Sequence, residues 1–274
     1  MLDSLKVGLR AVGRRSLIVV LLFLYEIIRG FILYRYVRSV IAPILYRYPG
    51  EEIPNWSTLF WIESEIRLLK TDMADGYMLT LLAMLFIRMM LTPLINAGVF
   101  QTIHHASGDP WRMFIDGIRR MWGRFLSLYV LQSSAALAPL FWLIPPVAEA
   151  LRDGNLDSLL QPGSVLPWIA YLLYIALVRL YFMYIQFAVA SGERWRASML
   201  IWLKKLLPAL GLSACILLAA LVVQSMLAVA SLIWAGLAAL IIYQATPLLR
   251  VALKIWEIAS QHDLWLRNIS MSSR

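Results

Sequence analysis

The chain has few of the residues from which most enzymes build their sites. It contains one cysteine and three histidines, and only 15% of its residues are charged. The single cysteine, Cys215, lies inside an apolar stretch, so an intrachain disulfide is excluded. We find no phosphate-cradling glycine loop, no nucleophile elbow and no paired carboxylates flanking a cleft. We therefore expect no enzyme activity and no cofactor.

The histidines do not follow the spacing of a metal site. His104 and His105 are adjacent, and adjacent side chains on a helix point about 100° apart. Helical zinc sites instead place two histidines four residues apart. The third, His262, precedes Asp263 in the C-terminal segment. The sequence therefore predicts no metal site.

Apolar residues, in contrast, are abundant. They form 61% of the chain, and the mean hydropathy is +0.72. About twenty apolar residues in a helix cross the roughly 30 Å hydrocarbon core of a bilayer. We therefore predict an all-α, polytopic transmembrane bundle, with residues 1–274 forming a single integral membrane domain. The six predicted spans are Leu17–Tyr36, Tyr77–Phe100, Met121–Ile144, Pro167–Ala190, Leu207–Val229 and Leu232–Leu253.

Two further features concern the course of these spans. The fifth and sixth follow one another without a polar loop, which predicts a tight turn near Ala230–Ser231. Proline lacks an amide hydrogen and can kink a helix, freeing a carbonyl. Prolines inside or at the edges of spans are Pro93, Pro139, Pro208 and Pro247.

The charged residues between spans predict the orientation. With the N-terminus in the cytoplasm, the cytoplasmic segments carry most of the 25 lysines and arginines. The opposite segments, 35–76 and 145–165, carry more acidic than basic residues. This asymmetry follows the positive-inside rule, so we expect both termini in the cytoplasm. It also explains most of the net charge of +9, which argues against a nucleic-acid partner. The cytoplasmic segments are 1–16, 101–124, 191–205 and 250–274.

Two segments have the pattern of helices lying at a membrane surface. Residues 2–15 place leucines on one face and Lys6, Arg10 and Arg14 on the other. No small-residue cleavage site follows, so we expect the first span to be retained. Residues 57–70 repeat the pattern on the external side. The external segment 145–165 is predicted to be a loop with a short amphipathic piece.

Four charged residues lie within predicted spans. Arg88 and Arg179 are near the centres of the second and fourth, and Glu26 and Arg29 are three residues apart in the first. A charge at mid-bilayer costs at least about 2.5–3.5 kcal/mol, so it usually has a partner or a task. The surplus of arginine suits an anionic substrate such as a lipid phosphate. Two alternatives stay open, namely a structural ion-pair network and a proton relay through Glu26.

The sequence around Arg88 partly recurs around Arg179. In each copy a span with a central arginine precedes a Ser-Gly turn, a Trp-Arg pair, an amphipathic stretch, a basic pair and the next span. The pattern predicts a parallel internal repeat, 77–144 and 167–230, with a central site between the copies. Chance similarity between leucine-rich spans is the alternative.

A weak resemblance covers residues 77–260. It depends on Pro93 and Gly98, on Phe114, Gly117 and Arg120, and on the segment Phe125-Leu126-Ser127-Leu128. On these residues the chain resembles a loose group of bacterial six-span membrane proteins of uncharacterised function. The group includes the membrane domain attached to some glycerophosphodiester phosphodiesterases. The resemblance implies a bacterial cytoplasmic (plasma) membrane location, with any chemistry in a separate soluble domain for which this chain has no room.

Two basic, amphipathic cytoplasmic segments could contact a partner. Their basic residues are Arg112, Arg119, Arg120, Arg196, Lys204 and Lys205. They could bind a separate ATPase subunit or another membrane protein, or could rest on anionic inner-leaflet lipid. We predict a permease-like transport or export component for an anionic or amphiphilic solute. The alternative is a scaffold or regulatory membrane protein whose intramembrane charges are structural.

Overall fold

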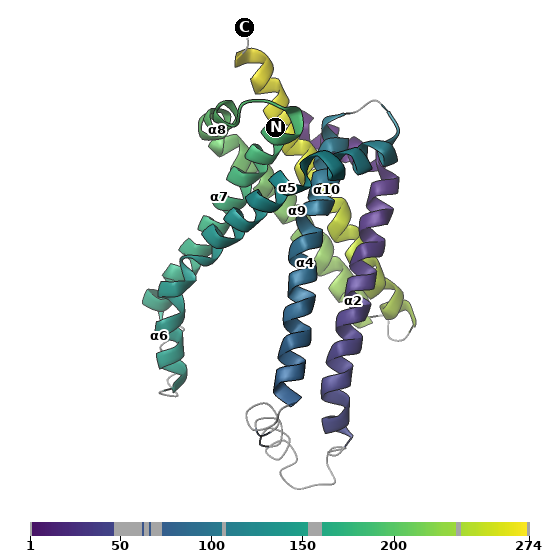
Figure 1. The fold of residues 1–274 in the computed structure, drawn as a ribbon, viewed down its shortest axis with the longest axis vertical. Coiled ribbons are helices and arrows are strands. Elements are labelled where there is room, and N and C mark those ends of the chain that lie inside the picture. The colour runs from purple at the N-terminus through teal and green to yellow at the C-terminus, as the bar shows by residue number, and fades with distance from the viewer. Residues whose placement is uncertain are drawn as a thin grey trace. The chain divides into compact units, whose positions relative to one another are not determined.

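A computed structural model describes residues 2–46, 62, 66, 73–105, 108–152, 161–233 and 237–272. Every described element is an α-helix, which confirms the all-α class (Figure 1). The chain divides into two compact units. Unit 1 comprises Met1–Val19 and Pro93–Arg274, and unit 2 comprises Val20–Thr92.

The long apolar helices indicate an integral membrane protein. In the described ranges, 4 helices are long and apolar enough to cross a bilayer, or up to 5 with one bent pair. Six spans are therefore not confirmed. The predicted sixth window falls on α10 (Leu237–Ser272), which is not among these candidates. The candidates are Ser16–Ser39, Asp75–His104, Gly163–Ser191, Leu206–Ile233 and the bent pair Pro110–Leu137 with Leu140–Ala150.

The bent pair corrects the third predicted span, Met121–Ile144. It consists of α5 (Pro110–Leu137) and α6 (Leu140–Arg152), which meet at an angle of 41°. Pro139 stands at the break, where its ring and missing amide hydrogen end the first helix. Because α6 reaches Arg152, the first part of the predicted loop 145–165 is helical.

The carbonyls freed at this break are used by α7 (Pro162–Ser191). Pro139 cannot donate to the carbonyl of Ala135, four residues earlier. The Tyr174 hydroxyl donates to that carbonyl at 2.9 Å, and the Tyr171 hydroxyl donates to the carbonyl of Ala136 at 3.0 Å. Two tyrosines one turn apart thus fasten α7 to the broken helix, and Figure 1 shows the two running side by side.

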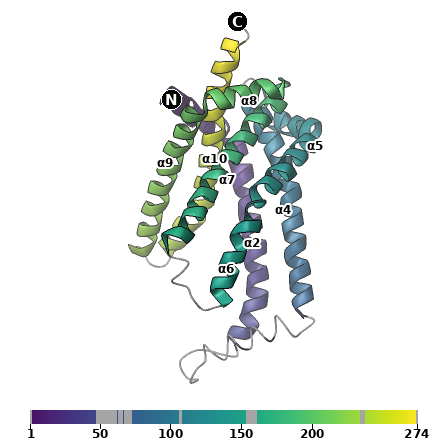
Figure 2. The same cartoon turned by 90° about the vertical axis from the view of Figure 1, so that its left-hand side faces the viewer.

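The turn predicted at Ala230–Ser231 is placed too early. The helix α9 (Leu206–Ile233) continues through both residues, and α10 begins at Leu237. Small residues carry no signal that distinguishes a helix from a turn in an apolar run. The helix α10 runs back beside α9 (Figure 2) and stays helical into the predicted cytoplasmic segment.

Close packing in unit 1 depends on two glycines. A Cβ atom at Gly98 of α4 (Met73–His104) would lie 2.4 Å from the Phe114 ring. A Cβ atom at Gly117 of α5 would lie 2.7 Å from the carbonyl oxygen of Ala97. Both distances are below van der Waals contact, so only glycine lets α4 and α5 approach this closely.

The core of unit 1 lies at one end of its helices. It is formed by the last turns of α4, the first half of α5, the second half of α7, the first half of α9 and the second half of α10. These are the parts nearest the predicted cytoplasmic side. The opposite ends expose large apolar side chains such as Phe141, Leu166 and Leu232, as expected of surfaces that meet lipid. Fully buried core residues include Phe125, Tyr184, Phe187, Leu212, Ile255 and Trp265.

Unit 2 contains most of α2 (Ser16–Leu45) and the first part of α4. The Tyr36 hydroxyl donates to the carbonyl of Tyr77 at 2.7 Å, which joins the two helices. Most described side chains here are exposed. The external helix predicted over 57–70 lies outside the described residues, apart from Ile62 and Ile66.

Candidate functional site

The candidate span α7 carries an arginine that meets a carboxylate of α10. The Arg179 guanidinium donates to Glu257 and forms an ion pair with it. The Arg179 side chain is 55% exposed, whereas the Glu257 side chain is 15% exposed. The carboxylate is therefore enclosed by protein, and the guanidinium keeps one open side.

From Glu257 a chain of hydrogen bonds continues into the core. The Ser213 hydroxyl of α9 donates to the second Glu257 oxygen at 3.3 Å. One turn along α10, the Gln261 amide donates to the Ser213 hydroxyl at 3.0 Å and to the Ala209 carbonyl at 2.8 Å. The Tyr184 hydroxyl donates to the Gln261 side-chain oxygen at 3.0 Å.

We call Arg179, Tyr184, Ser213, Glu257 and Gln261 the polar network. Its members come from α7, α9 and α10, and Tyr184 and Gln261 are both fully buried. Each buried polar atom has a partner, as a low-polarity interior requires. The network therefore joins three helices and places its one open cationic group at the end of a buried polar path.

Sequence reasoning singled out Arg179 but missed its partner Glu257. Glu257 was counted with the cytoplasmic segment 250–274, because the charges of Arg250 and Lys254 ended the sixth apolar window. The available signal was the i,i+4 spacing of Glu257 and Gln261 between buried apolar residues. That spacing places both on one face of a continuing helix.

The predicted pairing of Glu26 with Arg29 is present in unit 2. The two side chains form an ion pair across one turn of α2, and both are partly exposed. Neighbouring charges at i,i+3 satisfy one another locally. This pair therefore needs no other helix.

Arg88 of unit 2 has a different environment. It is exposed on α4, and none of the described residues of unit 2 forms an ion pair with it. Its carbonyl accepts a hydrogen bond from the Thr92 hydroxyl at 2.7 Å. A site that brings Arg88, Arg179 and Glu26 together remains a prediction.

A second cluster of charge lies at the core end of unit 1. The N-terminal helix α1 (Leu2–Arg14) packs against α10, as Trp256 donates to the Leu5 carbonyl at 2.9 Å. A Cβ atom at Gly8 would lie 2.0 Å from the Ser260 hydroxyl oxygen. The small residues Ser4 and Gly8 of α1 are therefore the ones that pack against α10. Leu9, on the predicted apolar face of α1, remains exposed.

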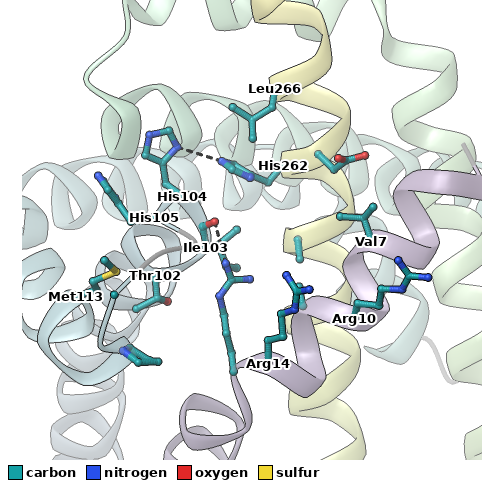
Figure 3. Close-up of a pocket in the computed structure, with 16 residues that line it drawn as sticks. Val7, Arg10, Arg14, Thr102, Ile103, His104, His105, Met113, His262 and Leu266 are labelled. Carbon is teal, nitrogen blue, oxygen red and sulfur yellow. Dashed lines mark hydrogen bonds between the residues drawn. The ribbon is translucent and has the colours of Figure 1, made fainter.

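This packing creates a pocket between α1, the end of α4, the start of α5 and α10. Its volume is about 390 Å³. Figure 3 shows arginines from α1 and histidines from α4 and α10 around it. We call the six basic lining residues the basic pocket: Arg10, Arg14, Arg15, His104, His105 and His262.

Arg15, just after α1, links this side of the pocket to α4 by a hydrogen bond. Its guanidinium donates to the Ile103 carbonyl at 3.1 Å. Ile103 lies in the last turn of α4, where carbonyls have no partner within the helix and the helix dipole favours a cation. Burial, followed by the charge of Arg14, lowers the pKa of Arg15 from its usual value. An arginine nevertheless stays charged.

Two histidines meet on the other side of the pocket. The His104 Nδ1 atom is 3.3 Å from the His262 Nε2 atom (Figure 3), and the His262 ring stacks on Trp265. Burial, with smaller contributions from the nearby His104 and Arg15, lowers the pKa of His262 to about 3. His262 is therefore neutral near pH 7, and the three arginines carry positive charge in the pocket.

The pocket does not have the composition of a metal site. In the part of the chain that the structure describes, no group of three or more His, Cys, Asp or Glu side chains could hold a metal ion. The only acidic residue among the lining groups is Asp263, which pairs with Arg267 at 2.9 Å.

The basic residues predicted to contact a partner or lipid lie on α5 and α8 (Trp195–Lys204) and just after it. Arg112 is 3.9 Å from Asp109, and the Arg196 guanidinium lies 5.5 Å from the Trp195 ring centre. Arg119, Arg120 and Lys204 are exposed. Their surfaces are therefore accessible to an acidic partner or headgroup.

Comparison with protein-family models, curated proteins and solved structures gives no match. The resemblance to bacterial six-span proteins therefore stays an expectation from the residues that carry it.

Proposed function

We propose that the chain is a membrane-embedded transport or export component for an anionic or amphiphilic solute, without catalytic activity of its own. The observation that supports this is the open side of Arg179 at the end of the polar network. A half-exposed guanidinium within an apolar span is costly unless it has a partner. Arg179 has one, Glu257, and still presents further N–H groups outward.

The chemistry of this pair suits exchange of one anion for another. A guanidinium has five N–H donors and can bind carboxylate or phosphate through two at once. Glu257 also accepts a hydrogen bond from Ser213. This bond would still stabilise the carboxylate when the Arg179 guanidinium binds a solute. An arriving anion would thus compete with Glu257 for the Arg179 guanidinium, and Glu257 would keep its hydrogen bond from Ser213.

Energy and partners are part of the same proposal. A separate ATPase subunit or another membrane protein would contact the basic surfaces of α5 and α8. Anionic inner-leaflet lipid is the other acidic partner that these surfaces suit. We place the protein in a bacterial cytoplasmic membrane with both termini in the cytoplasm.

The test uses membrane vesicles from cells that express the full chain. Fluorescent NBD-labelled phosphatidylglycerol is added outside, and the fraction protected from dithionite is followed over time. We expect transfer above that of vesicles lacking the protein, and a loss of at least about tenfold for Arg179→Gln/Glu257→Gln. The double variant removes both charges together, so the fold is preserved.

Lys6→Gln is the matched control, because it removes one positive charge from an exposed position outside both the polar network and the basic surfaces of α5 and α8. It should transfer lipid at the wild-type rate. Wild-type vesicles that match empty ones, or a double variant that matches wild type at equal folded yield, would refute the transport proposal.

The second candidate, a scaffold that binds another membrane protein, is favoured by the completeness of the polar network. Every described bond in it is internal, linking α7, α9 and α10. Under this alternative the charges only hold helices together. Native-lipid purification would then recover a stoichiometric membrane partner with wild type and with the double variant alike.

A further inference from the structure

We propose that the basic pocket of unit 1 is a binding site for a phosphate-bearing anion. The site is separate from the polar network, and it would function in the same way in a transporter or in a scaffold. Three observations support it: the shape of the pocket, its uncompensated charge and its mixed polar and apolar wall.

The size of the pocket suits a small phosphate ester, such as a lipid headgroup, rather than a single ion. A volume of about 390 Å³ lies within the range of about 300–1,000 Å³ typical of small-molecule sites. Its walls come from helices distant in sequence, so their packing preforms the pocket. Figure 3 shows Arg10 and Arg14 on α1, with His104 across the pocket on α4.

The charge of the pocket is uncompensated. Among the described residues, no carboxylate forms an ion pair with Arg10, Arg14 or Arg15. Asp263, the acidic lining residue, is held by Arg267. Three arginines in one pocket repel one another, and an anion between them removes that repulsion.

The position of Arg15 favours phosphate in particular. Its bond to the Ile103 carbonyl uses one terminal nitrogen and fixes the guanidinium plane. The other N–H groups then form a preorganised fork, which matches two phosphate oxygens. The neutral imidazole of His262 can donate or accept a hydrogen bond according to its tautomer.

The rest of the wall is apolar. Val7, Met113 and Leu266 line the pocket beside the basic groups (Figure 3). A phosphate ester of glycerol, carrying acyl chains or free, would place its anionic end at the arginines and its carbon atoms against these side chains. Lipid and soluble phosphate esters share this chemistry, and the experiment separates them.

The experiment measures ligand retention by native mass spectrometry of the delipidated full chain in detergent. One arm offers phosphatidic acid together with an equal amount of phosphatidylcholine. The other arm offers glycerol 3-phosphate alone. The pocket variant is Arg10→Gln/Arg14→Gln, because both side chains are exposed and have no described ion-pair partner. Arg194→Gln/Arg250→Gln removes the same charge from exposed positions that belong neither to the pocket nor to the six residues predicted to contact a partner or lipid, and it serves as the control.

We expect wild type and the control to retain one phosphatidic acid in preference to phosphatidylcholine. The pocket variant should retain at least about tenfold less, as loss of charge-assisted hydrogen bonds implies. Arg15→Lys keeps the charge but loses the fork, so its retention should fall between the two. The same order with glycerol 3-phosphate and not with lipid supports the site with a soluble ligand.

Two outcomes would overturn the proposal. Equal losses in the pocket variant and in the control would show that general charge attraction, not a site, holds the anion. Failure of wild type to retain either probe would show that the pocket binds no phosphate. Neither outcome depends on transport, so the proposed function is tested separately.

Discussion

The two units deal with intramembrane charge differently. In unit 1, Arg179 has a counter-charge from another helix, and Glu257 is itself supported by Ser213. Among the described residues of unit 2, Arg29 pairs with its local neighbour Glu26, and the exposed Arg88 has no ion pair. Arg88 and Arg179 occupy similar positions in the predicted repeat. Similar sequence surroundings therefore do not provide equivalent partners, because the partner comes from a distant helix.

The largest effect should follow from breaking the pair in unit 1. Glu257→Gln leaves Arg179 without a counter-charge inside an apolar span, and we expect a loss of about 3 kcal/mol in the free energy of unfolding. This is the lower end of the usual range for buried pairs, since Arg179 is half exposed. Thermal unfolding in detergent, followed by size-exclusion chromatography, measures it.

The double variant Arg179→Gln/Glu257→Gln should recover part of that loss, because no lone charge remains. If Glu257→Gln alone leaves the unfolding temperature unchanged, the ion pair does not support unit 1 and the contrast between the units fails.

A smaller effect should appear on acidification. The folded pKa of His262, about 3, lies below the value of about 6.5 expected in the unfolded chain. The unfolded state therefore binds more protons between these pH values, so stability is full above about pH 6.5 and falls as the pH decreases. The contribution lost by pH 5 is about 2 kcal/mol.

Carboxylates also titrate in this range, so the measurement is the difference between wild type and His262→Gln. The variant should lose less stability than wild type between pH 7 and pH 5. His105→Gln, an exposed neighbour, should behave as wild type does. Identical pH profiles for wild type and His262→Gln would mean that the imidazole is not held neutral by burial.

The smallest effect is expected in unit 2. Arg88→Gln removes no ion pair among the described residues of unit 2, so the free energy of unfolding should change by less than about 1 kcal/mol. The same thermal assay measures it, with Glu257→Gln as the reference. A loss as large as that of Glu257→Gln would show that Arg88 has a partner of comparable strength, and the two units would then be alike.

Much of the fold could be predicted because apolar length is a local property. The helices of the first, second, fourth and fifth spans follow from runs of about twenty apolar residues. The bend at Pro139 follows from the missing amide hydrogen. The extent of α10 did not follow, because its charged residues Arg250 and Lys254 have the composition of a cytoplasmic segment although the backbone stays helical.

The candidate sites could be predicted only in part. The sequence indicated Arg179 because a charge in an apolar run is conspicuous. It gave no indication of Glu257, nor of the meeting of His104 with His262, since these contacts join residues far apart in the chain. The distance between His104 and His262 depends on how α4 and α10 pack, and periodicity within one helix contains no information on that.

The packing of α1 against α10 has a consequence for biosynthesis. The bond from Trp256 to the Leu5 carbonyl spans 251 residues of chain. The amphipathic α1 leaves the ribosome long before its partner helix exists, and closing so long a loop is slow compared with local helix formation. Until α10 is synthesised, the face of α1 that carries Gly8 lacks the helix against which it packs. We therefore expect α1 to dock late in assembly, after α10 has been synthesised and has packed beside α9.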